Sequence, residues 1–319
     1  MSITELDPTA TVAQPESAAA AGIWAPAVTP LDQDLAPEPE RFAAHVRWLL
    51  DNGCHGVAVF GTTGEATSFS VDERIALLDA ALEAGIPAER LMIGTGCCAL
   101  TDSVRLTRHA VESGCNRVLM LPPFYYKGAS DEALAASYEA VIERVGHDGL
   151  EVFLYHFPRL SGVPITVGLV ERLLASPHAA AIKGIKDSSG DAEGTRAFIA
   201  QFPGLAVFPG TEALLLTGLE AGGAGCITAS ANVNAPAIRR VYDAWGAGSA
   251  ETAGLQEIIS AQRAALQSQP LISTLKRILA QAHGDPAWLA MRPPLLPTGE
   301  ADAAAQDAAL AAAGFAFGA

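Results

Sequence analysis

The feature that most constrains the fold is an alternation that repeats eight times between residues 22 and 248. Short apolar runs are each followed by an amphipathic segment of helix length. Apolar strands joined by helices are typical of a parallel sheet covered on both faces. The expected strands are, in order, IWAPAV, GVAVF, LMIGTG, RVLMLP, EVFLYHF, AIKGIK, LAVFPG and AGCITA. Eight such units that close on themselves predict an α/β fold, a (β/α)8 TIM barrel with its chemistry at the carboxyl ends of the strands.

The runner-up fold is an open, doubly wound sheet. It should carry a glycine-rich dinucleotide turn after an early strand, with an acidic residue about 20 residues later. The turn FGTTGE after the second expected strand lacks that pattern, so the barrel is favoured. Because a hydroxyl can accept a free N–H of the first helical turn, Ser70 and Thr101 are the expected N-caps of two helices. Helices are expected to begin near Pro37, Val71, Asp102, Ser130, Thr166, Asp191, Glu212 and Asn234.

The chain divides into three segments. Residues 1–21 are polar, contain proline and show no period, which predicts a disordered or loosely docked tail. Residues 22–248 form the expected catalytic barrel. After Ser249 the alternation stops, and three helical patterns, one of them beginning at Pro270, predict a C-terminal helical extension over residues 249–319.

Composition excludes some classes of partner. The formal charge of −15 argues against a nucleic-acid surface, which needs a basic face, and disfavours anionic membranes. No apolar run reaches the roughly 20 residues of a membrane span. The five cysteines are odd in number and include no CxxC pair, so free thiols in a reducing cytoplasm are expected, without a zinc site.

Lysine is rare in this chain, and two of its four lysines lie in the strand-like run AAIKGIKDSSG. Since side chains alternate along a strand, Lys183 and Lys186 should point to opposite sides. Lys186 lies at the carboxyl end of the expected strand, where burial disfavours the charged amine. A neutral amine is a nucleophile suited to form a Schiff base with a ketone or aldehyde. The structural alternative is an ion pair with Asp187 or another carboxylate.

Two neighbouring segments could complete a site around Lys186. Tyr155 ends the preceding strand and should face the same barrel mouth, where a phenol can relay protons; the alternative is a packed core tyrosine. His156 should point to the opposite face, as a packing histidine. The turn GTTGE, residues 61–65, offers free N–H groups and hydroxyls to a carboxylate, although Glu65 could instead hold the shape of the loop.

With these residues in order, the chain resembles the dihydrodipicolinate synthase/N-acetylneuraminate lyase superfamily of class I aldolases. The motifs that carry the resemblance are GTTGE, LPPFYYK, YHFPRLSGVPIT, GIKDSSGD, FPGTEALL and AGCITASANV. The resemblance implies a homotetrameric (dimer-of-dimers) barrel that binds pyruvate or a related 2-keto acid as an imine, without a metal or organic cofactor.

The resemblance also implies roles for individual residues. It makes Lys186 the Schiff-base lysine and Tyr155 the acid/base. Thr62 and Thr63 would bind the pyruvate carboxylate, and Tyr125 would reach into the site of a neighbouring subunit. The expected pocket and substrate contacts are completed by Gly210, Ile227, Ser188 and Glu212.

Departures from the family pattern bear on the substrate. Leu160 stands where lysine-pathway synthases carry an arginine for the distal carboxylate, with Arg159 one place earlier. Phe124 replaces the first tyrosine of a pair. Glu212 is followed by Ala213, so a long sugar tail would find few partners. A smaller 4-hydroxy-2-oxo acid is therefore favoured over dihydrodipicolinate synthesis. A 2-keto acid dehydratase or hydratase would use the same imine, while a non-catalytic binding barrel and a phosphate-binding isomerase are disfavoured.

Overall fold

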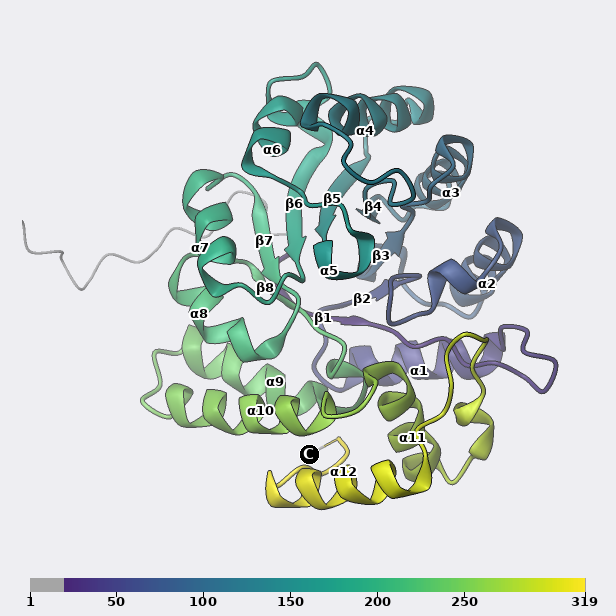
Figure 1. The fold of residues 1–319 in the computed structure, drawn as a ribbon, viewed down its shortest axis with the longest axis vertical. Coiled ribbons are helices and arrows are strands. Elements are labelled where there is room, and N and C mark those ends of the chain that lie inside the picture. Colours follow the sequence, from purple (N-terminus) through teal and green to yellow (C-terminus); the bar gives the residue numbers. More distant parts are fainter. Residues whose placement is uncertain (1–19, 319) are drawn as a thin grey trace, which may run out of the picture.

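The protein is described by a computed structural model that covers residues 20–318. Its core is an eight-stranded sheet of parallel strands in the order β7-β6-β5-β4-β3-β2-β1-β8. The Ala224 N–H donates to the Val207 carbonyl (2.9 Å) where β7 meets β8, which closes the sheet into a barrel (Figure 1). The strands are β1 (Gly22–Pro26), β2 (Gly56–Val59), β3 (Leu91–Gly94), β4 (Arg117–Met120), β5 (Glu151–His156), β6 (Ile182–Asp187), β7 (Ala206–Pro209) and β8 (Gly225–Ile227). The predicted (β/α)8 barrel is confirmed.

Helices surround the barrel and continue beyond it (Figure 1). Those of the barrel are α1 (Pro39–Asp51), α2 (Val71–Glu83), α3 (Leu100–Glu112), α4 (Asp131–Val145), α5 (Pro158–Ser161), α6 (Val167–Leu174), α7 (Ala192–Gln201), α8 (Leu215–Glu220) and α9 (Ala231–Gly246). The later ones are α10 (Thr252–Leu266), α11 (Leu271–His283) and α12 (Glu300–Ala312). Short 3-10 turns span Ala66–Ser68, Ala88–Arg90, Ala179–Ala181, Glu212–Leu214 and Pro286–Leu289. None of the helices between residues 20 and 318 is long and apolar enough to cross a membrane.

The two predicted N-caps have different outcomes. Ser70 caps α2 through a capping box with Glu73, as expected for a serine before a helix with Glu at its third position. The expectation for Thr101 is wrong, because α3 already begins at Leu100 and Ala99 takes the N-cap position. In the first turn of α3, the Ser103 hydroxyl accepts from the Cys97 N–H (2.9 Å), which lies before the helix.

Strand side chains alternate between two apolar layers, as the period of a strand requires. The layer between strands and helices includes Val57, Val59, Val152, Leu154 and Ile185. The layer inside the barrel includes Trp24, Met92, Leu119, Phe153 and Phe208. The interior of the barrel is therefore a filled apolar core.

Helices α10 and α11 of the C-terminal extension pack against α9 (Figure 1), and Trp288 and Phe317 of the extension contact α1. Their buried side chains form a third apolar cluster with residues of the barrel, including Val28, Val233, Leu275, Leu279, Trp288 and Leu310. The predicted tail lies outside the described residues except at its end. There Ala20 is buried, and its carbonyl accepts from Trp24 Nε1 (2.7 Å).

Candidate active site

Two side chains from adjacent strands meet at the carboxyl end of the barrel. In the register of β5 and β6, Tyr155 lies beside Lys186. The Lys186 Nζ is 4.4 Å from the centroid of the Tyr155 ring, and both side chains are buried. The register shifts by one residue between Val152 and Phe153, so that Lys183 is the extra residue of a bulge. Lys186 and Tyr155 are therefore held on rigid strands and face one another.

Asp187 does not pair with Lys186. Its carboxylate accepts from Thr195 Oγ1 (2.6 Å) and the Ser189 N–H (2.9 Å). Within residues 20–318, no carboxylate forms an ion pair with Lys186. The structural alternative of a Lys186–Asp187 ion pair is thus excluded, and the Lys186 amine remains without a charge partner in the part of the chain that is described.

His156 has the packing role that its strand parity predicts. Its Nδ1 accepts from the Ile165 N–H (2.9 Å), and its ring packs edge-on against Phe198. Burial lowers the pKa of His156, although the nearby Asp187 carboxylate opposes that effect. The imidazole is therefore a neutral hydrogen-bond acceptor in the wall of the barrel.

The turn after β2 brings a hydroxyl to Tyr155. The hydroxyls of Thr62 and Tyr155 are 3.2 Å apart, within hydrogen-bond distance. Thr63 is buried beside it, and a Cβ placed on Gly61 would meet nothing within 4 Å, so space is open next to the turn. The backbone N–H groups of Thr62 and Thr63 donate to no acceptor within residues 20–318. The turn thus presents free donors beside Tyr155, as an anion-binding turn does.

Three further residues expected at the site lie at the ends of β6 to β8. The Gly210 N–H donates to the Asp187 carbonyl (2.6 Å), and a Cβ on Gly210 would approach the Ser188 Oγ to 2.1 Å. This position therefore admits glycine only, with Ser188 packed against it. Ile227 is fully buried in the same inner cluster as Tyr155.

Glu212 is placed differently from the other expected contacts. Its side chain is fully buried and accepts from the Thr228 hydroxyl, and Arg263 Nη1 of α10 lies 3.5 Å from the same carboxylate oxygen. The Arg263 guanidinium also donates to Ser230 Oγ (2.7 Å). A direct contact between Glu212 and a substrate would require this ion pair to open. Sequence reasoning missed Arg263, because the local sequence of α10 does not indicate which distant carboxylate pairs with this arginine.

Tyr125 lies on the exposed loop after β4, away from the buried pair. It is 74% exposed, its neighbour Tyr126 is 78% exposed, and their rings meet edge to face. The Lys127 Nζ donates to the carbonyls of Phe124 and Ser161, which ties this loop to α5. Leu160 of α5 is 62% exposed. One chain therefore does not bring Tyr125 together with Lys186.

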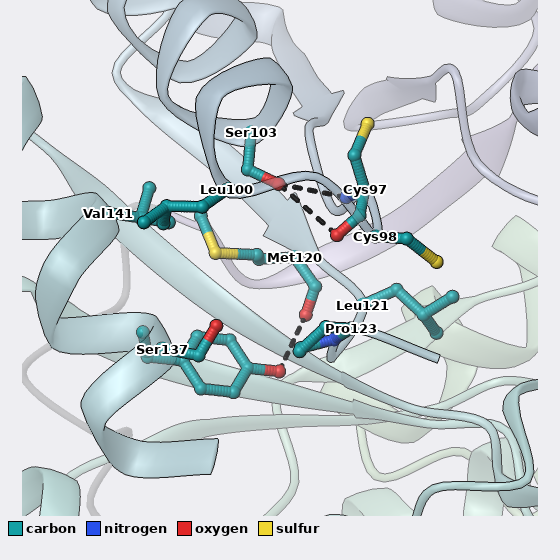
Figure 2. Close-up of a pocket in the computed structure, with 10 residues that line it drawn as sticks. Cys97, Cys98, Leu100, Ser103, Met120, Leu121, Pro123, Ser137 and Val141 are labelled. Atoms are coloured by element: carbon teal, nitrogen blue, oxygen red, sulfur yellow. Dashed lines mark hydrogen bonds between the residues drawn. The ribbon is translucent and has the colours of Figure 1, made fainter. Parts of the chain in front are cut away.

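A pocket elsewhere on the barrel contains none of the expected site residues (Figure 2). It is lined by residues of α3, α4 and the segments that follow β3 and β4. Two of its hydroxyls are bonded to the backbone, since Tyr138 OH donates to the Met120 carbonyl (3.2 Å) and Ser103 Oγ accepts from the Cys97 N–H (2.9 Å) (Figure 2). The hydroxyls of Tyr138 and Ser103 are thus engaged within the protein.

Comparisons with known proteins identify the family of the chain. The chain matches the model of the dihydrodipicolinate synthetase family over residues 19–313. A DapA-like lyase of Chloroflexus aurantiacus is 38% identical over 293 residues, which cover 90% of this chain and 95% of the relative.

Solved structures of members of the same family superpose on the chain. Dihydrodipicolinate synthase from Agrobacterium tumefaciens superposes with a TM-score of 0.83 at 29% identity, covering 91% of this chain and 98% of that one. YagE from Escherichia coli K12, a member of the same family solved with pyruvate, superposes with a TM-score of 0.84 at 26% identity, covering 93% and 99%. The chain therefore belongs to the dihydrodipicolinate synthetase family and is a carbon–carbon lyase of the class I aldolase type.

Proposed function

We propose that the protein cleaves or forms a 4-hydroxy-2-oxo acid, with pyruvate and an aldehyde as the other reactants, through an imine on Lys186. The observation that supports the proposal most directly is the sequence of contacts from Lys186 to Tyr155 and from Tyr155 to Thr62. It joins a buried amine that has no carboxylate partner in the described residues, a phenol beside it and a hydroxyl 3.2 Å from that phenol.

The reaction follows from the chemistry of these groups. The Lys186 Nζ attacks the C2 carbonyl, and loss of water from the carbinolamine leaves an iminium. The iminium accepts the electron pair of the C3–C4 bond as that bond breaks, which gives an enamine and an aldehyde. Tyr155 accepts the proton of the C4 hydroxyl in this step and returns it in the reverse direction. Protonation of the enamine at C3 and hydrolysis then release pyruvate and free Lys186.

The turn after β2 supplies the binding of the carboxylate. The free N–H groups and hydroxyls of Thr62 and Thr63 can hold the C1 carboxylate of the 2-oxo acid next to Lys186. The Thr62 hydroxyl also orients the Tyr155 phenol. A substrate anchored in this way needs no metal ion for carboxylate recognition.

The mouth of the site favours a neutral distal group on the substrate. Leu160 offers an apolar side chain, and the amine of Lys127 is already bound by two carbonyl oxygens. These observations support a short hydroxylated chain, as in a 2-keto-3-deoxy sugar acid, over the second carboxylate of hydroxy-oxoglutarate. Ser188, at the end of β6, would contact a hydroxyl of that chain. Dihydrodipicolinate synthesis is the second candidate and requires another cation for the distal carboxylate.

We also propose assembly as a homotetramer in the cytoplasm. The exposed aromatic pair Tyr125 and Tyr126 supports a subunit contact, because two exposed tyrosines on one loop are typical of interface residues. A second copy of the chain would bring Tyr125 to the Thr62–Tyr155 pair of its neighbour. The five free cysteines are consistent with a reducing compartment.

The test is a panel of 4-hydroxy-2-oxo acids incubated with purified protein, in which pyruvate and the aldehyde product are measured separately. We expect release of both from a 2-keto-3-deoxy sugar acid. A 2-oxo product without an aldehyde would instead indicate dehydration. An unchanged panel, together with no borohydride-dependent adduct with pyruvate, would contradict the proposal.

A further inference from the structure

The second fully buried lysine of the chain contacts the turn that carries Thr62 and Thr63. Lys276 of α11 and Glu65 of the turn form an ion pair, and both side chains are completely inaccessible to solvent. The Lys276 Nζ also donates to the Ala290 carbonyl (2.8 Å). Within residues 20–318 no hydrogen bond from another group reaches the Glu65 carboxylate, so Lys276 is its charge partner.

The backbone of this turn is held in a conformation that non-glycine residues rarely adopt. Phe60 (φ 59°) and Glu65 (φ 57°) lie in the left-handed region on either side of the Gly61–Gly64 segment. Such residues persist only where the surrounding structure fixes them, and they cluster at functional sites. The turn is closed by the Glu65 N–H, which donates to the Thr62 carbonyl (3.0 Å). Any shift of Glu65 is thus transmitted directly to Thr62.

We propose that Lys276 is a positioning residue, which holds the Thr62–Thr63 turn in its substrate-binding conformation through Glu65. The C-terminal extension is then part of the active-site scaffold. A buried carboxylate without its partner must either take up a proton or move toward water. Either change would release the end of the turn and disorder the carboxylate-binding donors, while Lys186 and Tyr155 stay in place on their strands. This inference rests on the imine chemistry proposed above.

The test compares Lys276→Met with Arg277→Met, a neighbouring change on the same helix. Arg277 pairs with Asp307 (2.7 Å) and Gln306 (2.9 Å) of α12 and does not contact the turn. Borohydride trapping is measured as a function of pyruvate concentration. We expect Lys276→Met to raise the half-saturating pyruvate concentration at least tenfold with an unchanged maximal extent of trapping, and Arg277→Met to leave both unchanged.

The double variant Glu65→Gln/Lys276→Met keeps the test decisive if the single variant does not fold. It leaves no unpaired charge in the core, so we expect a thermal midpoint close to that of the wild type. Its half-saturating pyruvate concentration should remain raised, because nothing fixes the end of the turn. A wild-type value in this variant, or an equal increase in Arg277→Met, would overturn the inference. Wild-type protein that traps no pyruvate would instead refute the proposed imine chemistry.

Discussion

Lys186 and Lys276 are both buried, but their surroundings are opposite. Lys186 lies at the rim of the barrel against the Tyr155 ring, and no carboxylate pairs with it within residues 20–318. Lys276 lies where the extension meets the barrel, paired with Glu65 and bonded to a carbonyl. Burial lowers the pKa of Lys276, and the Glu65 carboxylate acts against that effect.

The role of a buried lysine depends on the groups that surround its amine. Removing a lysine from water disfavours its charge, and a nearby carboxylate compensates for that cost. Lys276 has such a carboxylate in Glu65 and is held in a structural ion pair. Lys186 has no such carboxylate within residues 20–318 and lies against the Tyr155 ring, so no ion pair has to break before its amine meets a carbonyl group. The partner, rather than burial itself, separates the lysine that we propose to form the imine from the structural one.

The largest effect is expected from Lys186→Arg. A guanidinium cannot form the imine, so turnover and pyruvate trapping should both be lost. Lys183→Arg is the matched control. It makes the same substitution at the bulge residue of the same strand and should leave trapping intact. Trapping that survives in Lys186→Arg but fails in Lys183→Arg would reverse the roles assigned to the two strand lysines.

Tyr155→Phe tests the phenol that lies beside Lys186. The substitution keeps the ring that packs against Lys186 but removes the proton-transfer group, so kcat should fall by about 10²–10⁴-fold. The adduct with pyruvate should still form on Lys186, although more slowly. Comparison of kcat with the final extent of borohydride trapping checks this separation. Equal turnover in Tyr155→Phe and wild type would remove Tyr155 from the mechanism.

Replacement of Lys186 and of Lys276 by methionine should change the free energy of unfolding by different amounts. Lys276→Met leaves Glu65 as an uncompensated buried charge, which lowers the free energy of unfolding by about 3–5 kcal/mol. Lys186→Met removes a buried amine that has no carboxylate partner in the described residues, so the free energy of unfolding should be unchanged or higher. Urea unfolding of both variants measures the difference. A larger loss for Lys186→Met would contradict the distinction.

The stability of the protein should also fall in acid, because His45 lies at the contact between the barrel and the extension. Its Nε2 is 2.8 Å from Asn232 Oδ1 and its ring meets Trp288 edge-on, and burial lowers its pKa from 6.5 to about 4. Because the unfolded chain binds the proton first, stability is lost as the pH falls from 6.5 to 4. The loss is about 3 kcal/mol for this residue.

The measurement for His45 is the pH dependence of urea unfolding in wild type and His45→Gln. Glutamine keeps a donor for Asn232 but does not titrate, while the other histidines contribute equally in both proteins. We expect the wild type to lose more stability than the variant over this range. Parallel curves would show that His45 does not control acid stability at this contact.

Much of the barrel could be predicted from the sequence because it depends on local pattern. The apolar runs identified all eight strands, and strand parity placed Tyr155 and Lys186 on one side and His156 on the other. The predicted cap at Thr101 was wrong, since α3 starts at Leu100, two residues before the expected start at Asp102. Local signals thus gave the strands securely and helix ends only approximately.

The supports of the site could not be predicted in the same way. Lys276 and Arg263 both lie in the extension, and their partners Glu65 and Glu212 lie in loops of the barrel. Such pairs depend on how the extension packs against the barrel, which no local period encodes. The scarcity of lysine was a usable signal, because a lysine on the apolar face of an expected helix needs a buried partner.

Formation of an imine between the amine of Lys186 and pyruvate can be measured directly. Wild-type protein is incubated with pyruvate and borohydride, digested and mapped by mass spectrometry. We expect a reduced pyruvate adduct on the peptide that contains Lys186, and unmodified peptides for Lys127, Lys183 and Lys276. An adduct confined to one of those other lysines, or no adduct at saturating pyruvate, would contradict the account.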